Sequence, residues 1–298
     1  MQINRIILFG YGYIGKSIIK NIEKENRKIT IISKNNEKLK NKNVKFIKST
    51  FENVKKWQNC INKNDLIIFT ISFYKNNNQN HKNLDKKKFF SAFQELILIS
   101  NKKCISRFIF LSSASVYSLK NKRIKKESFN EIPSTNYGKE KILIEKKLKT
   151  LNDQIIKIIF RISNIFDNNF NPNKNFIDKL IDNKIHNRLT EFSGSIYDIR
   201  DFVDLDFIVK IILNSINIKL KRKYNIFNLS SGCGISYLEI INLLKYKNVI
   251  FNIKNKATKI ILSNKKLFKN FDIYFKNPDI KLKKYLKKYT NWTYSNFN

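Results

Sequence analysis

A short apolar stretch followed at once by three closely spaced glycines opens the chain and constrains its fold most. The segment Arg5–Phe9 carries an unbroken apolar run, as strands buried on both faces do. The GxGxxG spacing after it predicts a tight turn into a helix that ends near Lys24, with the backbone free to approach a pyrophosphate at the helix N-terminus. Strand, motif and helix in this order favour dinucleotide binding over a simple glycine turn, and the motif residues are Gly10, Gly12, Tyr13, Ile14 and Gly15.

Apolar strand-like segments and helix-like segments then alternate along the first half of the chain. Phe89–Asn101 has apolar residues at helical spacing and follows an Asn-rich loop at 74–82. Alternation of this kind predicts an α/β fold with a doubly wound parallel sheet and right-handed crossovers. The further strands expected are Lys28–Ile32, Val44–Ile47, Leu66–Ser72, Phe108–Leu111 and Ile155–Phe160.

The stretch from Arg107 to Lys146 combines residues suited to proton transfer. Ser113 follows the apolar strand Phe108–Leu111, and Tyr137 and Lys141 stand four residues apart, on one face of a predicted helix. A tyrosine has an ordinary pKa near ~10, so it needs a nearby ammonium to act as a base at neutral pH. A serine hydroxyl can hydrogen-bond the same substrate oxygen. A solvated Tyr–Lys pair is the alternative in so lysine-rich a chain, and the upstream serines and glycine motif favour catalysis.

At these residues the chain resembles the extended short-chain dehydrogenase/reductases, in particular the NAD-dependent nucleotide-sugar epimerase/dehydratase group. The resemblance spans nearly the whole chain, with the motifs in the family's order. It implies a Rossmann-type sheet with a smaller C-terminal substrate-binding lobe. The segments that carry it are FGYGYIG (9–15), SSASVYS (112–118), NYGKEK (136–141), RISNIF (161–166), IRDFVDLDFIV (199–209) and YNIFNLSSGCGISYLEI (224–240).

The resemblance also implies a division of labour along the chain. Residues 1–166 are expected to bind the dinucleotide, with the segment 224–229 returning to that domain, and residues 167–298 to bind a nucleotide-sugar, most simply a UDP-sugar. Asn164 matches an asparagine that approaches the sugar nucleotide, and Arg200 an arginine that holds its diphosphate. Arginine can grip phosphate with two parallel hydrogen bonds. A structural pairing of Arg200 with Asp201 or Asp204 is the alternative.

The cofactor is expected to be NAD or NADP. NAD is favoured by the family, but the second strand ends in Ser33 and Lys34, where an NAD site places an acidic residue for the ribose hydroxyls. These two residues would tolerate a 2′-phosphate, so NADP stays open. By analogy with the family, Thr70 and Ile71 at the end of the fourth strand should lie against the cofactor, although the family's usual His-Leu-Ala is absent there.

The implied reaction is hydride exchange at a sugar carbon that bears a hydroxyl or a ketone. Tyr137 would remove the hydroxyl proton, Lys141 would stabilise the phenolate and hold the cofactor ribose, and Ser113 would orient the oxygen. The 4,6-dehydratase branch carries an Asp-Glu pair after the serine, where this chain has Ala114-Ser115. Dehydration is therefore disfavoured, and we expect a 4-epimerase in surface polysaccharide synthesis. An NADPH-dependent keto-sugar reductase is the second hypothesis, because reductive pathways usually draw on NADPH.

A non-catalytic dinucleotide sensor or RNA-associated protein on the same fold is a hypothesis of a different class. Such relatives commonly lose the Tyr or Lys, and this chain keeps both. Its net charge of +36 is spread along the sequence, with no arginine-rich patch, so no specific nucleic-acid partner is predicted. The resemblance further implies a homodimer through the helices at 89–101 and 137–149.

Composition supplies the remaining expectations. The chain has three well-separated cysteines and two histidines, His81 and His186, so neither a disulfide framework nor a metal site is predicted, and both histidines are expected in surface loops. The first residues lead straight into a strand, and no apolar run approaches the ~20 residues that span a bilayer. We therefore expect a cytoplasmic protein, closed by an amphipathic helix with a basic face around 281–292.

Overall fold

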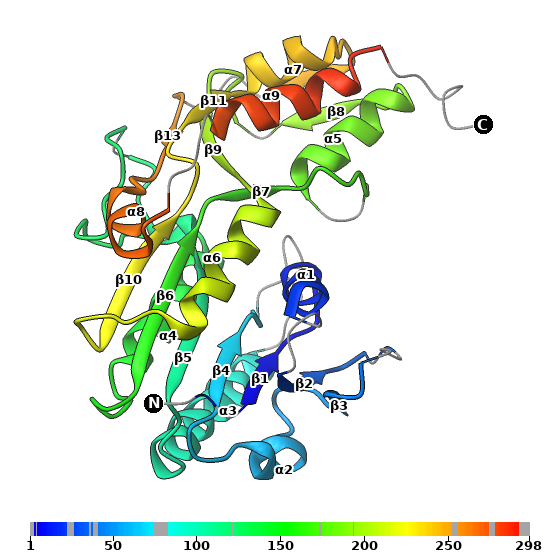
Figure 1. Cartoon of the computed structure of the whole chain (residues 1–298). Coiled ribbons are helices and arrows are strands. Elements are labelled where there is room, and N and C mark those ends of the chain that lie inside the picture. Colours follow the sequence, from blue (N-terminus) through cyan, green and yellow to red (C-terminus); the bar gives the residue numbers. More distant parts are fainter. Residues whose placement is uncertain are drawn as a thin grey trace. The chain divides into compact units, whose positions relative to one another are not determined.

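The computed structural model describes residues 3, 5–22, 27–35, 37, 41–73, 83–120, 122–172, 175–192, 194–251, 256–273 and 278–291. Contacts divide the chain into two compact units. The first unit comprises 1–116, 131–161 and 209–227, and the second comprises 117–130, 162–208 and 228–298. Figure 1 labels their elements. The expected division of cofactor and substrate binding at residue 166 stays a prediction.

A seven-stranded parallel sheet forms the centre of the Rossmann-like fold, in the order β10-β6-β5-β4-β1-β2-β3. The strand order reverses at β1, so the predicted doubly wound α/β fold is confirmed. The strands are β1 (Arg5–Phe9), β2 (Lys28–Ser33), β3 (Val44–Lys48), β4 (Leu66–Phe69), β5 (Arg107–Ser113), β6 (Ile156–Ile162) and β10 (Tyr224–Leu229).

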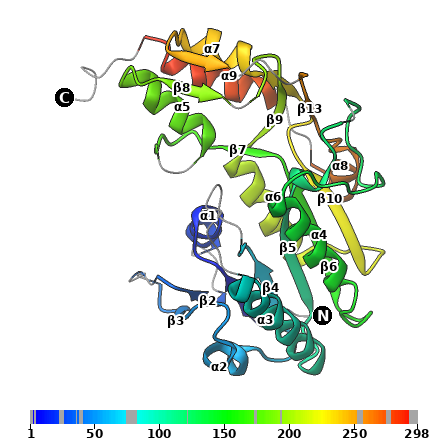
Figure 2. The same ribbon diagram turned by 180° about the vertical axis from the view of Figure 1, so that it is seen from behind.

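Helices cover both faces of this sheet. Figure 1 shows α1 and α6 in front of it, and Figure 2, turned by 180°, brings α3 and α4 to the front. Because side chains alternate along a strand, the two faces take different residues of β1. Leu8 lies toward α1, whereas Ile7 and Phe9 join the core under α3. The helices are α1 (Tyr13–Ile22), α2 (Val54–Trp57), α3 (Asn83–Lys102), α4 (Asn136–Leu148) and α6 (Leu205–Asn217), with 3₁₀ turns η1 (Gln58–Cys60) and η2 (Ala114–Val116).

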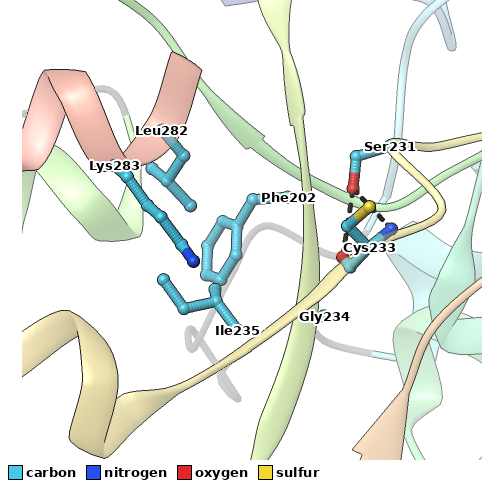
Figure 3. Close-up of a pocket in the computed structure, with 7 residues that line it drawn as sticks. All are labelled: Phe202, Ser231, Cys233, Gly234, Ile235, Leu282 and Lys283. Carbon is cyan, nitrogen blue, oxygen red and sulfur yellow. Dashed lines mark hydrogen bonds between the residues drawn. The ribbon is translucent and has the colours of Figure 1, made fainter. Parts of the chain in front are cut away.

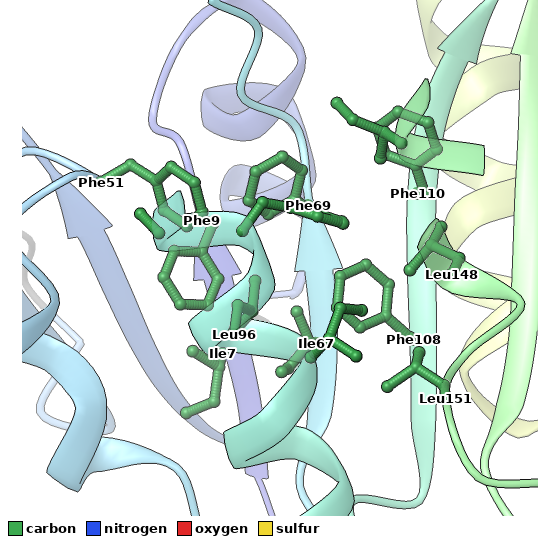
Figure 4. Packing of buried hydrophobic residues seen from close by; sticks show 14 of the residues in the cluster. Ile7, Phe9, Phe51, Ile67, Phe69, Leu96, Phe108, Phe110, Leu148 and Leu151 are labelled. Atoms are coloured by element: carbon green, nitrogen blue, oxygen red, sulfur yellow. The ribbon is translucent and has the colours of Figure 1, made fainter. Parts of the chain in front are cut away.

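An aromatic-rich core fills the space between the sheet and helices α3 and α4 (Figure 4). Phe69 of β4 is fully buried, with its ring centroid 5.8 Å from that of Phe9 and 5.2 Å from that of Phe93 on α3. Edge-on and tilted arrangements of this kind suit the charge distribution of aromatic rings. The core fixes the carboxyl ends of β1, β4 and β5, where ligands bind in open α/β sheets.

Predicted boundaries shift by a few residues at several elements, and the shifts at β4 and α3 have a clear cause. Strand β4 ends at Phe69 rather than at Ser72, because Thr70 turns away and its hydroxyl donates to the carbonyl oxygens of Phe9 (2.9 Å) and Gly10 (3.2 Å). Helix α3 begins at Asn83, earlier than its apolar periodicity shows, because the added turn is lysine-rich. The Asn-rich loop at 74–82, with His81, lies outside the described residues.

The second unit contains smaller sheets and further helices. Strand β9 pairs with β11, β13 and β7, and β12 pairs with β8. Helix α9 packs against α7 and carries Leu282, Tyr285 and Leu286 into the core, so the predicted amphipathic closing helix is confirmed. The elements are β7 (Asn164–Phe166), α5 (Phe176–Ile185), β8 (Thr190–Phe192), β9 (Ile199–Asp204), β11 (Gly234–Ser236), α7 (Tyr237–Leu244), β12 (Val249–Phe251), β13 (Lys259–Ile260), α8 (Lys265–Phe271) and α9 (Pro278–Lys288).

His186 is not a surface-loop residue as expected. It is the C-cap of α5, half-buried, and its Nδ1 lies 2.9 Å from the carbonyl oxygen and 3.2 Å from the carboxylate of Asp182. In the described part of the chain, no helix is long and apolar enough to cross a membrane.

Candidate active site

The glycine motif forms the predicted turn between β1 and α1. Gly10 has a φ of +101°, a conformation that side chains disfavour, and a Cβ there would lie 2.4 Å from the Thr70 hydroxyl oxygen. A Cβ on Gly15 would lie 2.4 Å from the carbonyl oxygen of Gly10, so α1 can pack this closely only with glycine. Gly12 has no neighbour within 4 Å of such an atom. Its exposed backbone is therefore open to a ligand at the start of α1.

A cleft of about 620 Å³ lies beside this turn, within the size range of small-molecule sites. Gly10, Gly12, Ser33, Lys34 and Ile71 line it, so five of the predicted cofactor residues share one cavity. They come from the ends of β1, β2 and β4, which lie side by side in the sheet. Thr70 lies against Gly10, at the edge of the same turn. The cleft therefore brings these residues together at one edge of the sheet, and their binding of a dinucleotide stays a prediction.

An acidic residue does lie near the end of β2, although not in the strand itself. Glu37 follows Gly15 by roughly the 20 residues that separate the ribose-binding acid from the motif in NAD sites. Its carboxylate contacts the Lys16 ammonium and accepts a hydrogen bond from the Tyr11 hydroxyl at 3.2 Å. The hydrogen bond from Lys16 lowers the pKa of the Glu37 carboxyl. Glu37 is therefore paired with Lys16 and Tyr11, whereas Ser33 and Lys34 line the cleft at the end of β2.

Tyr137 and Lys141 lie on α4 as predicted, one turn apart. The Lys141 Nζ is 5.3 Å from the centre of the Tyr137 ring and 5.0 Å from that of Phe110 on β5. Lys141 is almost fully buried, whereas Tyr137 is half-buried. Thr135 caps the helix, since its hydroxyl accepts from the Gly138 amide at 3.0 Å. The structure thus holds an ammonium beside a tyrosine ring at the carboxyl edge of β5.

Ser113 closes β5, and α4 packs against the η2 turn that follows it. Its Oγ accepts from the Ser115 amide at 3.1 Å and lies 3.2 Å from the Ser115 hydroxyl oxygen. The close approach of α4 depends on Gly138, where a Cβ would lie 2.2 Å from the Ser115 carbonyl oxygen. All three candidate catalytic residues therefore belong to one packed β5–η2–α4 segment.

A buried ion network connects β6 to α4 of this segment. Arg161, fully buried on β6, contacts Glu131 and donates to Glu145 of α4 at 2.7 Å. Glu145 also accepts from the Ser112 hydroxyl at 2.5 Å, one residue before Ser113. Breaking one side of such a buried charge network is strongly destabilising, because the other charge is left without a partner. This network fixes α4 relative to β5 and β6.

Arg200 lies on β9 of the second unit, and its guanidinium is already engaged. It donates to the Asp198 carboxylate at 3.1 Å and to the Thr258 hydroxyl at 2.9 Å, and stacks over the Tyr237 ring at 5.6 Å. Arg200 therefore does form a structural ion pair, as the alternative hypothesis stated, but its partner is Asp198 rather than Asp201 or Asp204. Asp198 takes that place because Asp201 and Asp204 point elsewhere.

Asn164 and Asp201 form a neighbouring polar cluster in the second unit. The exposed side chain of Asn164 donates to the Asp201 carbonyl oxygen at 3.1 Å. The fully buried Asp201 carboxylate accepts from Ser163, Ser231 and backbone amides, including that of Leu262 at 3.2 Å. Burial raises the pKa of Asp201 to about 6 despite these donors. Asp201 is thus the residue that ties β9 to the loop before β11.

A second cavity lies between β9, β11 and α9, and Figure 3 shows its lining. Its volume of about 20 Å³ is close to that of a single water molecule's site. Ser231 and Cys233 close one side of it with hydrogen bonds to each other at 3.1 Å. This cavity is too small for a nucleotide or a sugar. In the described part of the chain, no group of three or more His, Cys, Asp or Glu side chains is arranged to hold a metal.

Three residues in or beside the candidate site were not predicted from the sequence. Glu37 could have been found by counting from the glycine motif. Gly138 stands inside the quoted NYGKEK segment, but only the structure shows what it packs against. Glu140 is nearly fully buried beside Lys141, a position that the charged, lysine-rich sequence of α4 gives no reason to expect.

Comparison with known proteins agrees with this architecture. The chain superposes on UDP-glucose 4-epimerase from Thermotoga maritima with a TM-score of 0.80 at 17% identity, covering 99% of this chain and 100% of that one. UDP-glucuronic acid 4-epimerase from Bacillus cereus gives a TM-score of 0.81 at 17% identity, covering 99% and 100%. An NAD-dependent NDP-hexosamine 5,6-dehydratase of tunicamycin biosynthesis gives 0.77 at 15% identity, covering 96% and 98%. At these identities the likeness concerns the fold.

No curated protein matches the sequence. The family model described as "NAD dependent epimerase/dehydratase family" matches residues 6–230, about three quarters of the chain, from β1 to the loop after β10. The match includes the glycine turn, the β5–η2–α4 segment and Arg200. The chain therefore belongs to the NAD-dependent epimerase/dehydratase family.

Proposed function

We propose that this protein is a nucleotide-sugar 4-epimerase that transiently oxidises a sugar hydroxyl. The observation that carries the proposal is the β5–η2–α4 segment. There Ser113, Tyr137 and Lys141 stand in the family's order, with a buried ammonium 5.3 Å from the tyrosine ring. Fold likeness alone would not support an activity, because the same fold serves many reactions.

Each of these side chains has a distinct role in the proposal. Tyr137 takes the proton from the sugar hydroxyl and returns it, which requires the phenolate to be stabilised. The buried Lys141 ammonium supplies that stabilisation, and the Ser113 hydroxyl orients the substrate oxygen. A bound nicotinamide cofactor supplies the hydride exchange.

The dinucleotide is assigned to the cleft of the first unit. Gly10 and Gly15 allow the tight turn, Tyr13 and Ile14 begin α1, and Gly12 leaves the backbone open to a pyrophosphate at the start of that helix. Thr70 and Ile71 form the neighbouring wall. NAD is favoured by the family and by the Bacillus cereus epimerase, which was solved with NAD. Lys34 in the lining keeps NADP open, since an ammonium can bind a 2′-phosphate.

The substrate is assigned to the second unit, with Asn164 and Arg200 as its contacts. A UDP-sugar is the simplest choice, because the Thermotoga maritima and Bacillus cereus epimerases were solved with UDP-glucose and a UDP-glucuronic acid analogue. For Arg200 to bind a diphosphate, the phosphate oxygens would have to replace part of its bonding to Asp198 and Thr258. The predicted boundary, with 1–166 and 224–229 for cofactor and 167–298 for substrate, forms part of this proposal.

A keto-sugar reductase using NADPH is the second candidate, and Lys34 is the observation that favours it. A reductase releases oxidised cofactor in every cycle, whereas an epimerase retains it. Dehydration is disfavoured because η2 carries Ala114 and Ser115, with no carboxylic acid there to protonate the leaving hydroxyl. A non-catalytic sensor is disfavoured because Tyr137 and Lys141 are both present and paired.

The test is to incubate the purified protein with UDP-glucose, UDP-N-acetylglucosamine and UDP-glucuronic acid without added cofactor. Interconversion of 4-epimers is expected for at least one of them. Failure in all three, together with NADPH oxidation when a 4-keto sugar is supplied, would establish the reductase instead.

We also propose a homodimer through α3 and α4, which pack side by side in the first unit. Leu98 of α3 and Leu143 of α4 are about half exposed, at 51% and 44%. Leu98→Lys with Leu143→Lys should convert a dimer to a monomer on size-exclusion chromatography. A wild-type monomer would refute the dimer and leave the catalytic proposal untouched.

A further inference from the structure

A buried carboxylate joins the catalytic helix to the wall of the cofactor cleft. Glu140 lies on α4 directly before Lys141 and three residues after Tyr137, and only 1% of it is exposed. Its two carboxylate oxygens lie 2.9 and 3.1 Å from the Ser72 hydroxyl, and one of them accepts from the Phe73 amide at 3.1 Å. Ser72 and Phe73 follow β4 and line the cleft.

We infer that Glu140 is a positioning residue that couples occupation of the cleft to the placement of Tyr137 and Lys141. A buried carboxylate is costly unless hydrogen bonds satisfy it, so α4 has a strong preference for the rotation that keeps Glu140 on Ser72 and Phe73. Charge-assisted bonds of this type are stronger than neutral ones. The same helical rotation sets the direction of the Lys141 ammonium, because the two residues are adjacent on α4.

The hydrogen bonds of Glu140 connect the cleft wall directly to α4. Ile71, Ser72 and Phe73 form one wall of the cleft, and two of these three residues bond Glu140 directly. A dinucleotide that packs against this wall would restrict the movement of residues 71–73. Through the bonds to Glu140, these residues would in turn restrict the rotation of α4. Without the carboxylate, the wall and the helix would lose this connection.

The inference rests on the proposed function for its effect on turnover, but not for its effect on the loop. Four variants separate the effect on turnover from the effect on the loop. Glu140→Ala removes the contacts to Ser72 and Phe73, Glu140→Gln keeps one acceptor oxygen without the charge, and Ser72→Ala removes the hydroxyl donor. Ser100→Ala is the matched control, since this buried serine donates only to Leu96 within α3.

The first measurement is hydrogen exchange at the Phe73 amide in the full-length protein as purified. Glu140→Ala should speed this exchange by at least about tenfold, as expected for loss of a charged acceptor. Glu140→Gln should give a smaller increase, and Ser100→Ala none. An unchanged Phe73 amide in a folded Glu140→Ala variant would overturn the inference.

The second measurement is steady-state kinetics on the epimerised UDP-sugar. Glu140→Ala should lower kcat about 10- to 100-fold with KM within about twofold, because the reacting groups rather than substrate contacts are misplaced. Glu140→Gln should recover part of that loss, and Ser72→Ala should lose only a few-fold. Wild-type kcat in Glu140→Ala would overturn the inference. If Glu140→Ala does not fold, wild-type kcat and unchanged exchange in both Ser72→Ala and Glu140→Gln would do so.

Discussion

The β5–η2–α4 segment of the first unit and the Arg200 cluster of the second unit hold their functional side chains in different ways. Around Tyr137, contacts that hold helix α4 itself set the geometry: a threonine cap, a glycine that allows close packing, and a buried ion network beneath the helix. Around Arg200, side chains set it, with Asp198 and Thr258 occupying the guanidinium itself. The proposed catalytic residues therefore stand on a fixed helix, whereas the proposed ligand contact Arg200 is already bonded to other side chains.

The largest effect is expected from removing the Tyr137 hydroxyl. A small effect would remove the difference between the two regions that is drawn above. Tyr137→Phe is expected to lower turnover by on the order of 10²–10⁴, because the proton carrier is lost. The amount of dinucleotide retained by the purified protein should stay near the wild-type value. Tyr197→Phe, at a tyrosine that is 63% exposed, is the control. Near-normal turnover in Tyr137→Phe would refute the catalytic assignment.

Gly138 and Gly12, one closely packed and one open, test whether close packing of the backbone sets the geometry of the first region. Gly138→Ala would place a Cβ 2.2 Å from the Ser115 carbonyl oxygen, so we expect a loss of about 1–3 kcal/mol in stability and at least a tenfold loss of turnover. Gly12→Ala meets nothing within 4 Å. It should unfold at the wild-type temperature and retain less dinucleotide. Thermal unfolding measures the stability of each variant, and the nucleotide content of the purified protein measures how much dinucleotide it retains. A stable, active Gly138→Ala protein would contradict the packing argument.

A charge-conserving change tests whether Arg200 reaches a ligand at all. Arg200→Lys cannot form two parallel hydrogen bonds to a phosphate, so KM for the nucleotide-sugar should rise about tenfold with kcat little changed. A lower unfolding temperature with an unchanged KM would instead assign Arg200 to the structural cluster with Asp198 and Thr258. Thr258→Val, which removes one of its acceptors, is the matched structural control.

The smallest expected effect concerns cofactor choice at the end of β2. Lys34→Ala should weaken binding of NADP about threefold to tenfold and leave NAD nearly unaffected, because only NADP presents a phosphate there. Competition between the two dinucleotides for the protein measures the ratio. Equal loss for both would show that Lys34 does not contact the ribose end of the cofactor.

The first region could be predicted from the sequence because its signals are local. The apolar run of β1, the glycine spacing and the four-residue separation of Tyr137 and Lys141 all depend on neighbours in the chain. Their positions follow from helix and strand geometry, and the structure places them as expected. The catalytic and binding roles of these residues stay predictions.

The second region could not be predicted in the same way because its contacts are distant in sequence. Thr258 lies 58 residues from Arg200, and no periodicity indicates that they meet. Asp201 lies on the opposite face of β9 from Arg200, because alternate residues of a strand point to opposite faces. Asp204, four residues from Arg200, pairs with Lys281 instead, and the acid that does contact Arg200 is Asp198. The burial of Glu140 escaped for the same reason, since its partners come from the end of β4.

The central claim is that the cleft beside the glycine turn retains a dinucleotide through the catalytic cycle. Its most direct test is to denature the purified protein and identify the released nucleotide by mass spectrometry. We predict NAD or NADP at close to one molecule per chain, with Gly12→Ala retaining less. A protein that releases no dinucleotide, and that binds neither NAD nor NADP when these are added, would contradict the claim.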